Sequence, residues 1–136
     1  MTNMKIRVAA AFILDEHGHF LIAQRSKGML AGKWEFPGGK LEEGETDEMA
    51  IIREIEEELG VVVKPIKTIG VFNHQLVDLE IELVLIKCDL LPNQNIVSDG
   101  SHLQHAWIRL SEYNEYDFTV LDKELVQFLE KTGEIE

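Results

Sequence analysis

The stretch from residue 39 to residue 61, GKLEEGETDEMAIIREIEEELGV, combines a glycine-rich start with many acidic residues and an apolar pattern at helical spacing. Thr46 is a suitable N-cap with acidic residues directly after it, and Gly60 is a suitable C-terminal stop. The pattern therefore predicts a helix between these two residues. The side chains expected to face the core are Ile52, Ile55 and Leu59.

Three glutamates of this helix, Glu54, Glu57 and Glu58, stand at i, i+3 and i+4 and share one face near its C-terminal end. A solvated face and a cation site are both open interpretations, and solvation is the commoner use of such a run. Carboxylate oxygens would suit Mg²⁺ or Mn²⁺. Gly38 and Gly39 either form a tight turn or let the backbone approach a metal or phosphate closely.

The net charge of −12 argues against general affinity for nucleic-acid polymers, whose backbone would be repelled. A small anionic substrate would need basic side chains or a bound cation nearby. The 136 residues fit one domain, expected over 1–136, and no apolar run approaches the roughly 20 residues that span a bilayer. Cys88 lies in an apolar run and is expected in the core. We expect a cytoplasmic protein that does not bind membranes.

Strand patterns occur before, between and after two predicted helices. Residues 5–14 and 20–25 have strand composition, and the turn-forming residues between them predict a hairpin. Later strands are expected at 66–74, 79–90 and 105–110. A second helix is expected over 121–131, with an apolar stripe of Val120, Leu121, Leu125, Phe128 and Leu129. This order favours an α/β fold with a mixed sheet and helices on both sides.

The opening stretch resembles the signature of the Nudix hydrolases, Gly-x5-Glu-x7-Arg-Glu-U-x-Glu-Glu-x-Gly-U, where U is aliphatic. Its fixed positions are filled by Gly39, Glu45, Arg53, Glu54, Ile55, Glu57, Glu58, Gly60 and Val61. The preceding WEFPGG, residues 34–39, is similar to the MutT-like branch. The resemblance implies an α/β/α sandwich with a mixed central sheet and a catalytic loop–helix motif, and the predicted element order agrees with it.

By this resemblance, Glu54, Glu57 and Glu58 would bind Mg²⁺, with Mn²⁺ as a substitute and the Gly38 carbonyl as a further ligand. Arg53 would orient a glutamate by charge-assisted hydrogen bonding. A glutamate is the expected base, with Glu54 the first choice and Glu57 the second. Glu45 would help secure the loop and the helix.

The resemblance also suggests phosphate contacts from Arg25, after the second strand, and more weakly from Lys40. Many relatives supply another glutamate from the loop before a later strand. Here the segment 99–107, DGSHLQHAW, contains no glutamate, and either Asp99 or His102 could take its place or be solvated.

Base recognition is expected near Phe72, Asn73 and His74, which lie on a predicted strand. Asp122 falls where MutT-like relatives place a residue that contacts the base, and it is equally suited to cap the last helix. Phe118 could stack on a base, although a core position fits an aromatic side chain better.

The resemblance implies hydrolysis of a nucleoside triphosphate to nucleoside monophosphate and pyrophosphate, with 8-oxo-dGTP and CTP or dCTP as candidates. The expected enzyme acts on a small nucleotide as a monomer or homodimer. One alternative is a hydrolase of nucleotide sugars or dinucleotides. Another is a nucleotide-binding module without turnover, which the retained acidic residues disfavour.

Overall fold

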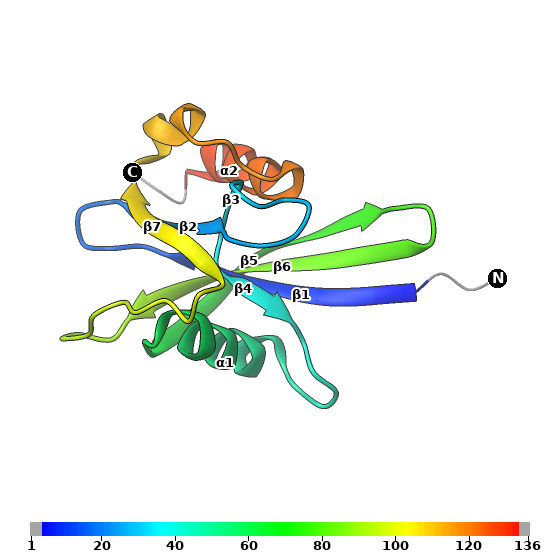
Figure 1. Ribbon diagram of the computed structural model, residues 1–136, viewed down its shortest axis with the longest axis horizontal. Coiled ribbons are helices and arrows are strands. Elements are labelled where there is room, and N and C mark those ends of the chain that lie inside the picture. The colour runs from blue at the N-terminus through cyan, green and yellow to red at the C-terminus, as the bar shows by residue number, and fades with distance from the viewer. Residues whose placement is uncertain (1–3, 134–136) are drawn as a thin grey trace.

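The computed structural model describes residues 4–133, which form two sheets between two helices (Figure 1). The strands of the larger sheet are, in spatial order, β4 (Gly38–Lys40), β1 (Met4–Ile13), β6 (Leu79–Leu90) and β5 (Val63–Gln75). Strand β1 runs parallel to β6 and antiparallel to β4, and β5 and β6 form a long antiparallel hairpin. The mixed sheet that the sequence predicts is therefore confirmed.

The smaller sheet lies at one end of the larger one. Its strands are, in spatial order, β3 (Trp34–Glu35), β2 (Phe20–Arg25) and β7 (His102–Ile108), and both pairings are antiparallel. A 3₁₀ helix, η1 (Leu110–Glu115), follows β7. This small sheet brings the ends of β2 and β3 next to the start of β7, which is distant in sequence, and these ends matter for the site described below.

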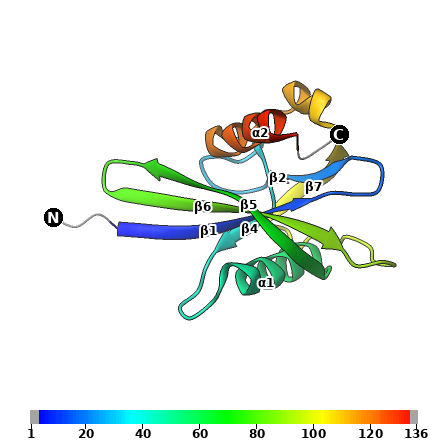
Figure 2. The ribbon, with the colours of Figure 1, turned by 180° about the vertical axis from the view of Figure 1, so that it is seen from behind.

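Helix α1 (Asp47–Leu59) covers one side of the sheets and α2 (Val120–Thr132) covers the other, as both views show (Figures 1 and 2). Strand β1 is buried on both faces from residue 9 to residue 13. Its residues Ala9, Ala11 and Ile13 pack in the cluster under α1, whereas Ala10 and Phe12 pack in the cluster under α2. Alternation along one central strand thus supplies both cores of the α/β/α sandwich.

The caps of α1 confirm its predicted ends. The Thr46 side chain accepts a hydrogen bond from the Met49 amide, and Gly60 ends the helix in the left-handed conformation at φ 66°. The expected core position of Ile52 is wrong, because this side chain is 37% exposed. The neighbouring Ile51 is buried instead, since it continues the i, i+4 row of Ile55 and Leu59.

Helix α2 confirms the second predicted helix and also changes its apolar stripe. Val120 is 72% exposed and is not part of the core, whereas Val126, which the prediction omits, is fully buried with Leu125 and Leu129. Val120 opens the helix directly after the N-cap Thr119, so its side chain precedes the turns that pack on the sheet.

The predicted hairpin of the first two strands is wrong. The two segments share only one antiparallel bridge, between Leu14 and Phe20, within the described residues. The strands themselves belong to different sheets, β1 to the larger and β2 to the smaller. Strand β1 is apolar on both faces in its second half, so it takes a central place between β4 and β6, with Val8 opposite both Lys40 and Leu83.

Cys88 lies in the core, where burial raises the pKa of its thiol to about 12, so its expected core role is confirmed. Within residues 4–133, neither helix is long and apolar enough to cross a membrane.

Candidate active site

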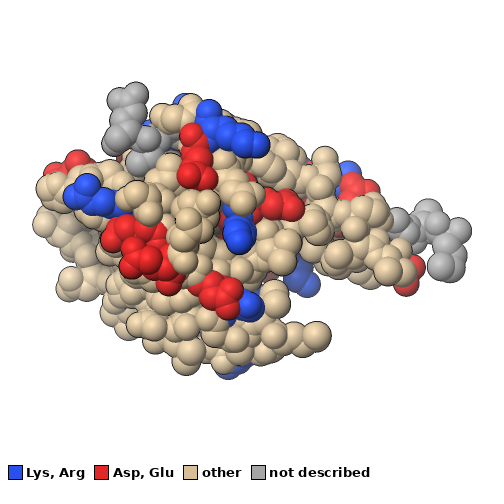
Figure 3. All heavy atoms as spheres, turned by 90° about the horizontal axis from the view of Figure 1, so that it is seen from above, with Lys and Arg blue, Asp and Glu red and all other residues tan. Residues whose placement is uncertain are grey.

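A cavity of about 830 Å³ opens between the β4–α1 region and the start of α2. One part of its lining is charged or polar and comes from Arg25, Glu35, Gly38, Glu58, Asp99, His102 and Asp122. Another part is apolar and comes from Val8, Leu30, Phe36, Leu76, Ile81, Leu83 and Leu121. Figure 3 shows acidic side chains gathered in a compact patch on one face, with basic side chains beside it. A cavity of this size and mixed lining suits a small ligand with a charged and an apolar end.

The two glycines of β4 allow its backbone to lie directly against α1. A Cβ atom added to Gly39 would stand 2.4 Å from the carboxyl carbon of Glu54. Gly38 has a φ of 153°, and a Cβ there would lie 2.0 Å from the Ala9 carbonyl oxygen. Both positions therefore require glycine, and the close approach brings backbone atoms next to the carboxylates of α1.

Glu58 is the most perturbed carboxyl group at this end of the cavity. Burial, which is the largest cause, and the nearby carboxylates of Glu54 and Glu35 together raise its pKa to about 9. A hydrogen bond from the Gly38 backbone amide acts in the opposite direction. Its Oε1 atom is buried and has no hydrogen-bond partner among the described residues. A half-buried carboxyl group beside a second one, with one buried oxygen that has no partner, fits a site for a cation.

Arg53 joins the loop to the helix and orients Glu54. Its Nε and Nη2 atoms donate to the two oxygens of Glu45 at 2.7 and 2.9 Å, and its Nη1 donates to Glu54 Oε1 at 2.9 Å. A fourth hydrogen bond runs from Nη2 to the Lys40 carbonyl at 3.0 Å. Hydrogen bonding to Arg53 lowers the pKa of Glu45 to about 2, so this carboxylate stays ionised and holds the arginine in place.

The three glutamates predicted to bind metal are not equivalent. The Glu54 side chain is only 16% exposed, and Glu58 lines the cavity. The Glu57 side chain is 58% exposed, and its carboxylate lies 3.3 Å from Arg53 Nη1. Within residues 4–133, no three histidine, cysteine or acidic side chains converge into a complete metal site. Mg²⁺ commonly takes only one or two protein carboxylates with water and substrate phosphates, so this arrangement still fits such an ion.

Both predicted phosphate contacts, Arg25 and Lys40, line the cavity. Arg25 is held by Glu35, with Nη1 and Oε1 2.9 Å apart, and its Nε is buried without a hydrogen-bond partner among the described residues. Lys40 is exposed on β4 beside the glycines. The positive charge that a polyanion needs is thus present in the same cavity as Glu58.

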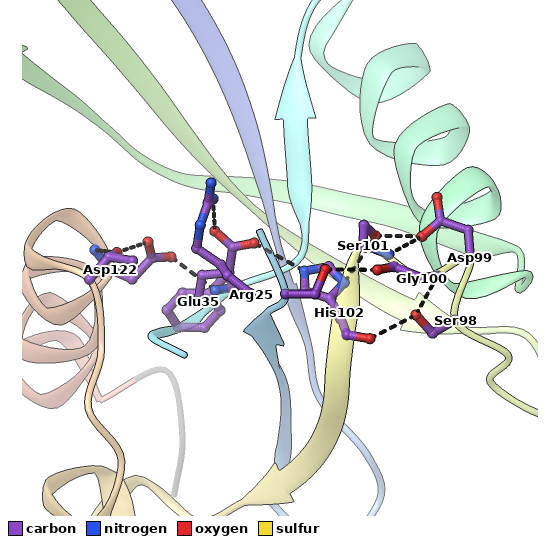
Figure 4. Close-up of polar contacts among 11 residues, drawn as sticks. Arg25, Glu35, Ser98, Asp99, Gly100, Ser101, His102 and Asp122 are labelled. Carbon is purple, nitrogen blue, oxygen red and sulfur yellow. Dashed lines mark hydrogen bonds and ion pairs between the residues drawn. The ribbon is translucent and has the colours of Figure 1, made fainter. Parts of the chain in front are cut away.

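The loop before β7 is attached to α1 by its backbone. The Asp99 amide donates to the Glu58 carbonyl at 3.0 Å, and the Asp99 side chain accepts from the Ser101 amide at 2.8 Å. His102 is buried, with Nε2 3.0 Å from Glu35 Oε2 (Figure 4). Asp99 and His102 therefore both line the cavity, but only Asp99 is bonded directly to the carboxylate helix.

The base-recognition residues predicted on β5 divide between the cavity and its surroundings. His74 lines the cavity, whereas Asn73 is exposed and is absent from the lining. Phe72 also lies outside the lining, and its ring packs edge-on against Phe128 with centroids 4.9 Å apart. Phe118 is 7% exposed and belongs to the core under α2, which agrees with the expectation for an aromatic side chain.

Asp122 faces the cavity and does not cap α2. The N-cap is Thr119, whose hydroxyl oxygen accepts from the Asp122 amide, so the capping alternative for Asp122 is wrong. The Asp122 carboxylate accepts from the Phe36 amide at 2.9 Å and from the Thr119 hydroxyl. Burial raises the pKa of Asp122 to about 7, although both of these hydrogen bonds lower it.

Glu35 is the main site residue that sequence reasoning missed. It is the second residue of WEFPGG and carries no spacing signal of its own. The structure shows it between Arg25 and His102, which come from distant segments, so only the fold reveals its role.

The sandwich, the glycine strand packed on an acidic helix and the cavity beside them define the architecture of a Nudix domain. The model of the NUDIX domain family matches residues 4–129, and the chain belongs to this family. It is a MutT-like member, as its relatives indicate.

Two curated relatives and one solved structure illustrate the similarity. An 8-oxo-dGTP diphosphatase of Proteus vulgaris is 43% identical over 84 residues, which cover 61% of this chain and 75% of the relative. A CTP pyrophosphohydrolase of Escherichia coli is 44% identical over 59 residues, covering 43% and 44% of the two chains. The crystal structure of the MutT protein from Methanosarcina mazei has a TM-score of 0.85 and 22% identity, covers 98% of this chain and 99% of its own, and supports the fold.

Proposed function

We propose that this protein hydrolyses a nucleoside triphosphate to nucleoside monophosphate and pyrophosphate with the help of a divalent metal ion. The observation that carries this proposal is the buried, unpartnered Glu58 oxygen beside Glu54, at the end of a cavity that also holds Arg25. The names of the relatives, 8-oxo-dGTP diphosphatase and CTP pyrophosphohydrolase, support the same reaction class.

The residues that would hold the metal are Glu54, Glu58 and the Gly38 carbonyl, with Glu57 as a further ligand from the exposed side of the helix. The unpartnered oxygen of Glu58 and the close approach of β4 fit this role. When bound, Mg²⁺ or Mn²⁺ would neutralise charge on the phosphates and lower the pKa of a water molecule. This accounts for polyanion binding by a protein with a net charge of −12.

The chain's own groups divide the remaining work. Glu54 is the proposed base for the attacking water, and Arg53 holds its carboxylate through a 2.9 Å hydrogen bond. Arg25 and Lys40, which both line the cavity, are the proposed contacts to the phosphates.

The apolar part of the cavity would take the nucleoside. Asp122 is the proposed contact to the base edge, because its carboxylate lines the cavity close to the Phe36 amide. Its two oxygens can accept further hydrogen bonds, and a protonated carboxyl could donate one. Candidate substrates are 8-oxo-dGTP, as acted on by the Proteus vulgaris relative, and CTP or dCTP, as suggested by the Escherichia coli relative.

A substrate panel with Mg²⁺ tests this proposal when pyrophosphate and orthophosphate are measured separately. We expect metal-dependent pyrophosphate release from one of the candidate triphosphates by the wild type. Glu54→Gln should lose roughly 10²–10⁴-fold in rate, the usual contribution of a general base. The matched control is Glu56→Gln, because Glu56 lies on the same helix but is exposed and outside the cavity lining.

Other products would redirect the proposal. Orthophosphate or sugar phosphate would favour the alternative, hydrolysis of a nucleotide sugar or dinucleotide. Nucleotide binding without turnover on the whole panel would favour a non-catalytic module. A cytoplasmic location, and a monomer or homodimer, stay predictions.

A further inference from the structure

Three side chains at one wall of the cavity form a hydrogen-bonded line outside the acidic helix (Figure 4). Arg25 Nη1 donates to Glu35 Oε1 at 2.9 Å, and His102 Nε2 lies 3.0 Å from Glu35 Oε2. Because a carboxylate only accepts, the His102 nitrogen that faces Glu35 is the donor. Each oxygen of Glu35 therefore receives one hydrogen bond, and the carboxylate is fixed from both sides.

The line passes through all three strands of the smaller sheet. Arg25 ends β2, Glu35 ends β3 and His102 begins β7, opposite Arg25 in the strand register. Side-chain exposure rises along the line, from 3% for His102 to 17% for Glu35 and 37% for Arg25. The buried histidine is thus the inner end and the arginine is the end that a ligand in the cavity can reach.

We propose that His102 and Glu35 are positioning residues that hold the Arg25 guanidinium for a substrate phosphate. Glu35 contacts one of the five N–H groups of Arg25, so most of the donors stay available. The buried Nε atom also has no hydrogen-bond partner among residues 4–133, so the protein leaves part of the hydrogen-bonding capacity of the guanidinium unused. This inference rests on the proposed function.

Holding the arginine before the substrate arrives reduces the conformational entropy that binding must otherwise remove. The effect should therefore appear in substrate affinity and leave the chemical step largely unchanged. In the opposite role, Glu35 would compete with the substrate phosphates for the Arg25 guanidinium. Competition predicts tighter substrate binding when the line is broken, so the sign of the change separates the two roles.

The test uses His102→Leu, which removes the donor to Glu35, and His102→Gln, which keeps a side-chain N–H. Steady-state kinetics on the best triphosphate should show KM raised roughly tenfold for His102→Leu, the ratio expected for one hydrogen bond to a charged group, with kcat within about twofold. The inhibition constant of pyrophosphate should rise in parallel. His102→Gln should fall between this variant and the wild type.

The matched control is His105→Leu, because His105 is exposed on the same strand and is not part of the cavity lining. It should leave KM and the pyrophosphate constant unchanged. In an Arg25→Ala background, His102→Leu should add no further increase in KM, since the histidine acts through the arginine. Thermal unfolding of each variant identifies those that fail to fold. If His102→Leu does not fold, the test relies on His102→Gln and Arg25→Ala.

Two results would overturn the inference: a lower KM in His102→Leu, or an undiminished effect of His102→Leu without Arg25. An inactive wild type would instead contradict the proposed function. In that case, calorimetric titration of magnesium pyrophosphate into the wild type and the His102 variants still decides the positioning role, because unchanged affinity would reject it.

Discussion

The two helices face the same cavity in different ways. Helix α1 presents carboxylates from its C-terminal half, and Arg53 fixes Glu54 through contacts to Glu45 and Glu54 that are local in sequence. Helix α2 contributes Asp122 from its first turn, and this carboxylate is fixed by the Phe36 amide, 86 residues away. The end of the cavity proposed for chemistry is therefore encoded in one short segment, whereas the end proposed for base recognition depends on the whole fold.

The largest expected effect concerns the carboxylates of α1. Glu58→Gln should lower the rate of pyrophosphate release by roughly 100-fold or more, because the buried Oε1 atom of Glu58 is the proposed metal ligand. Glu57→Gln should lower it less, since that side chain is 58% exposed. Steady-state kinetics at several Mg²⁺ concentrations measure both. Equal losses of rate in the two variants would contradict the prediction that the less exposed glutamate contributes more to catalysis.

A second prediction compares two adjacent isoleucines of α1. Ile51→Ala should reduce the free energy of unfolding by about 2–5 kcal/mol, as is usual for a fully buried isoleucine. Ile52→Ala should cost less than about 1 kcal/mol, because Ile52 is 37% exposed. Urea unfolding of both variants, followed by circular dichroism, checks this ranking. A larger loss for Ile52→Ala would contradict the orientation of α1.

A third prediction concerns the other end of the cavity. Asp122→Ala should change the preference between nucleobases by roughly 1–3 kcal/mol, the discrimination associated with one polar contact to a base. Its effect on kcat for the best substrate should be smaller than that of Glu58→Gln. Ratios of kcat/KM across the substrate panel provide the measurement. An unchanged preference would remove Asp122 from base recognition.

The smallest expected effect is a pH dependence of stability. The pKa of Asp122 is about 7 in the folded protein against an ordinary value of 3.8, so the folded state retains a proton that the unfolded state has lost. Its contribution therefore falls as the pH rises from about 4 to about 7. Asp122→Asn removes this titration, and its melting temperature relative to the wild type should increase across that window. A constant difference would contradict the raised pKa.

The acidic helix could be predicted because its information is local. Thr46, Gly60 and the glutamate spacing are properties of one segment, and the structure confirms the helix between them. The error at Ile52 arose because periodicity alone does not fix the rotation of a helix by one residue, about 100°. The first hairpin failed because local turn chemistry cannot show that β1 pairs in parallel with β6.

The remainder of the candidate site was less accessible to sequence reasoning. His102 had two open interpretations, and only the structure places it 3.0 Å from Glu35. Phe72 was expected near the nucleobase because it lies on a predicted strand, but its ring packs on Phe128 instead. In each case the deciding contact joins segments far apart in the chain, and no spacing rule connects such segments.

The most direct test of the central claim is a calorimetric titration of MnCl₂ into the wild type, Glu58→Gln and the control Glu56→Gln. If the buried end of α1 holds the metal, Glu58→Gln should bind the ion roughly 10–100-fold more weakly, while Glu56→Gln should match the wild type. Equal affinity in all three proteins would contradict the claim that Glu58 and its neighbours form the metal site.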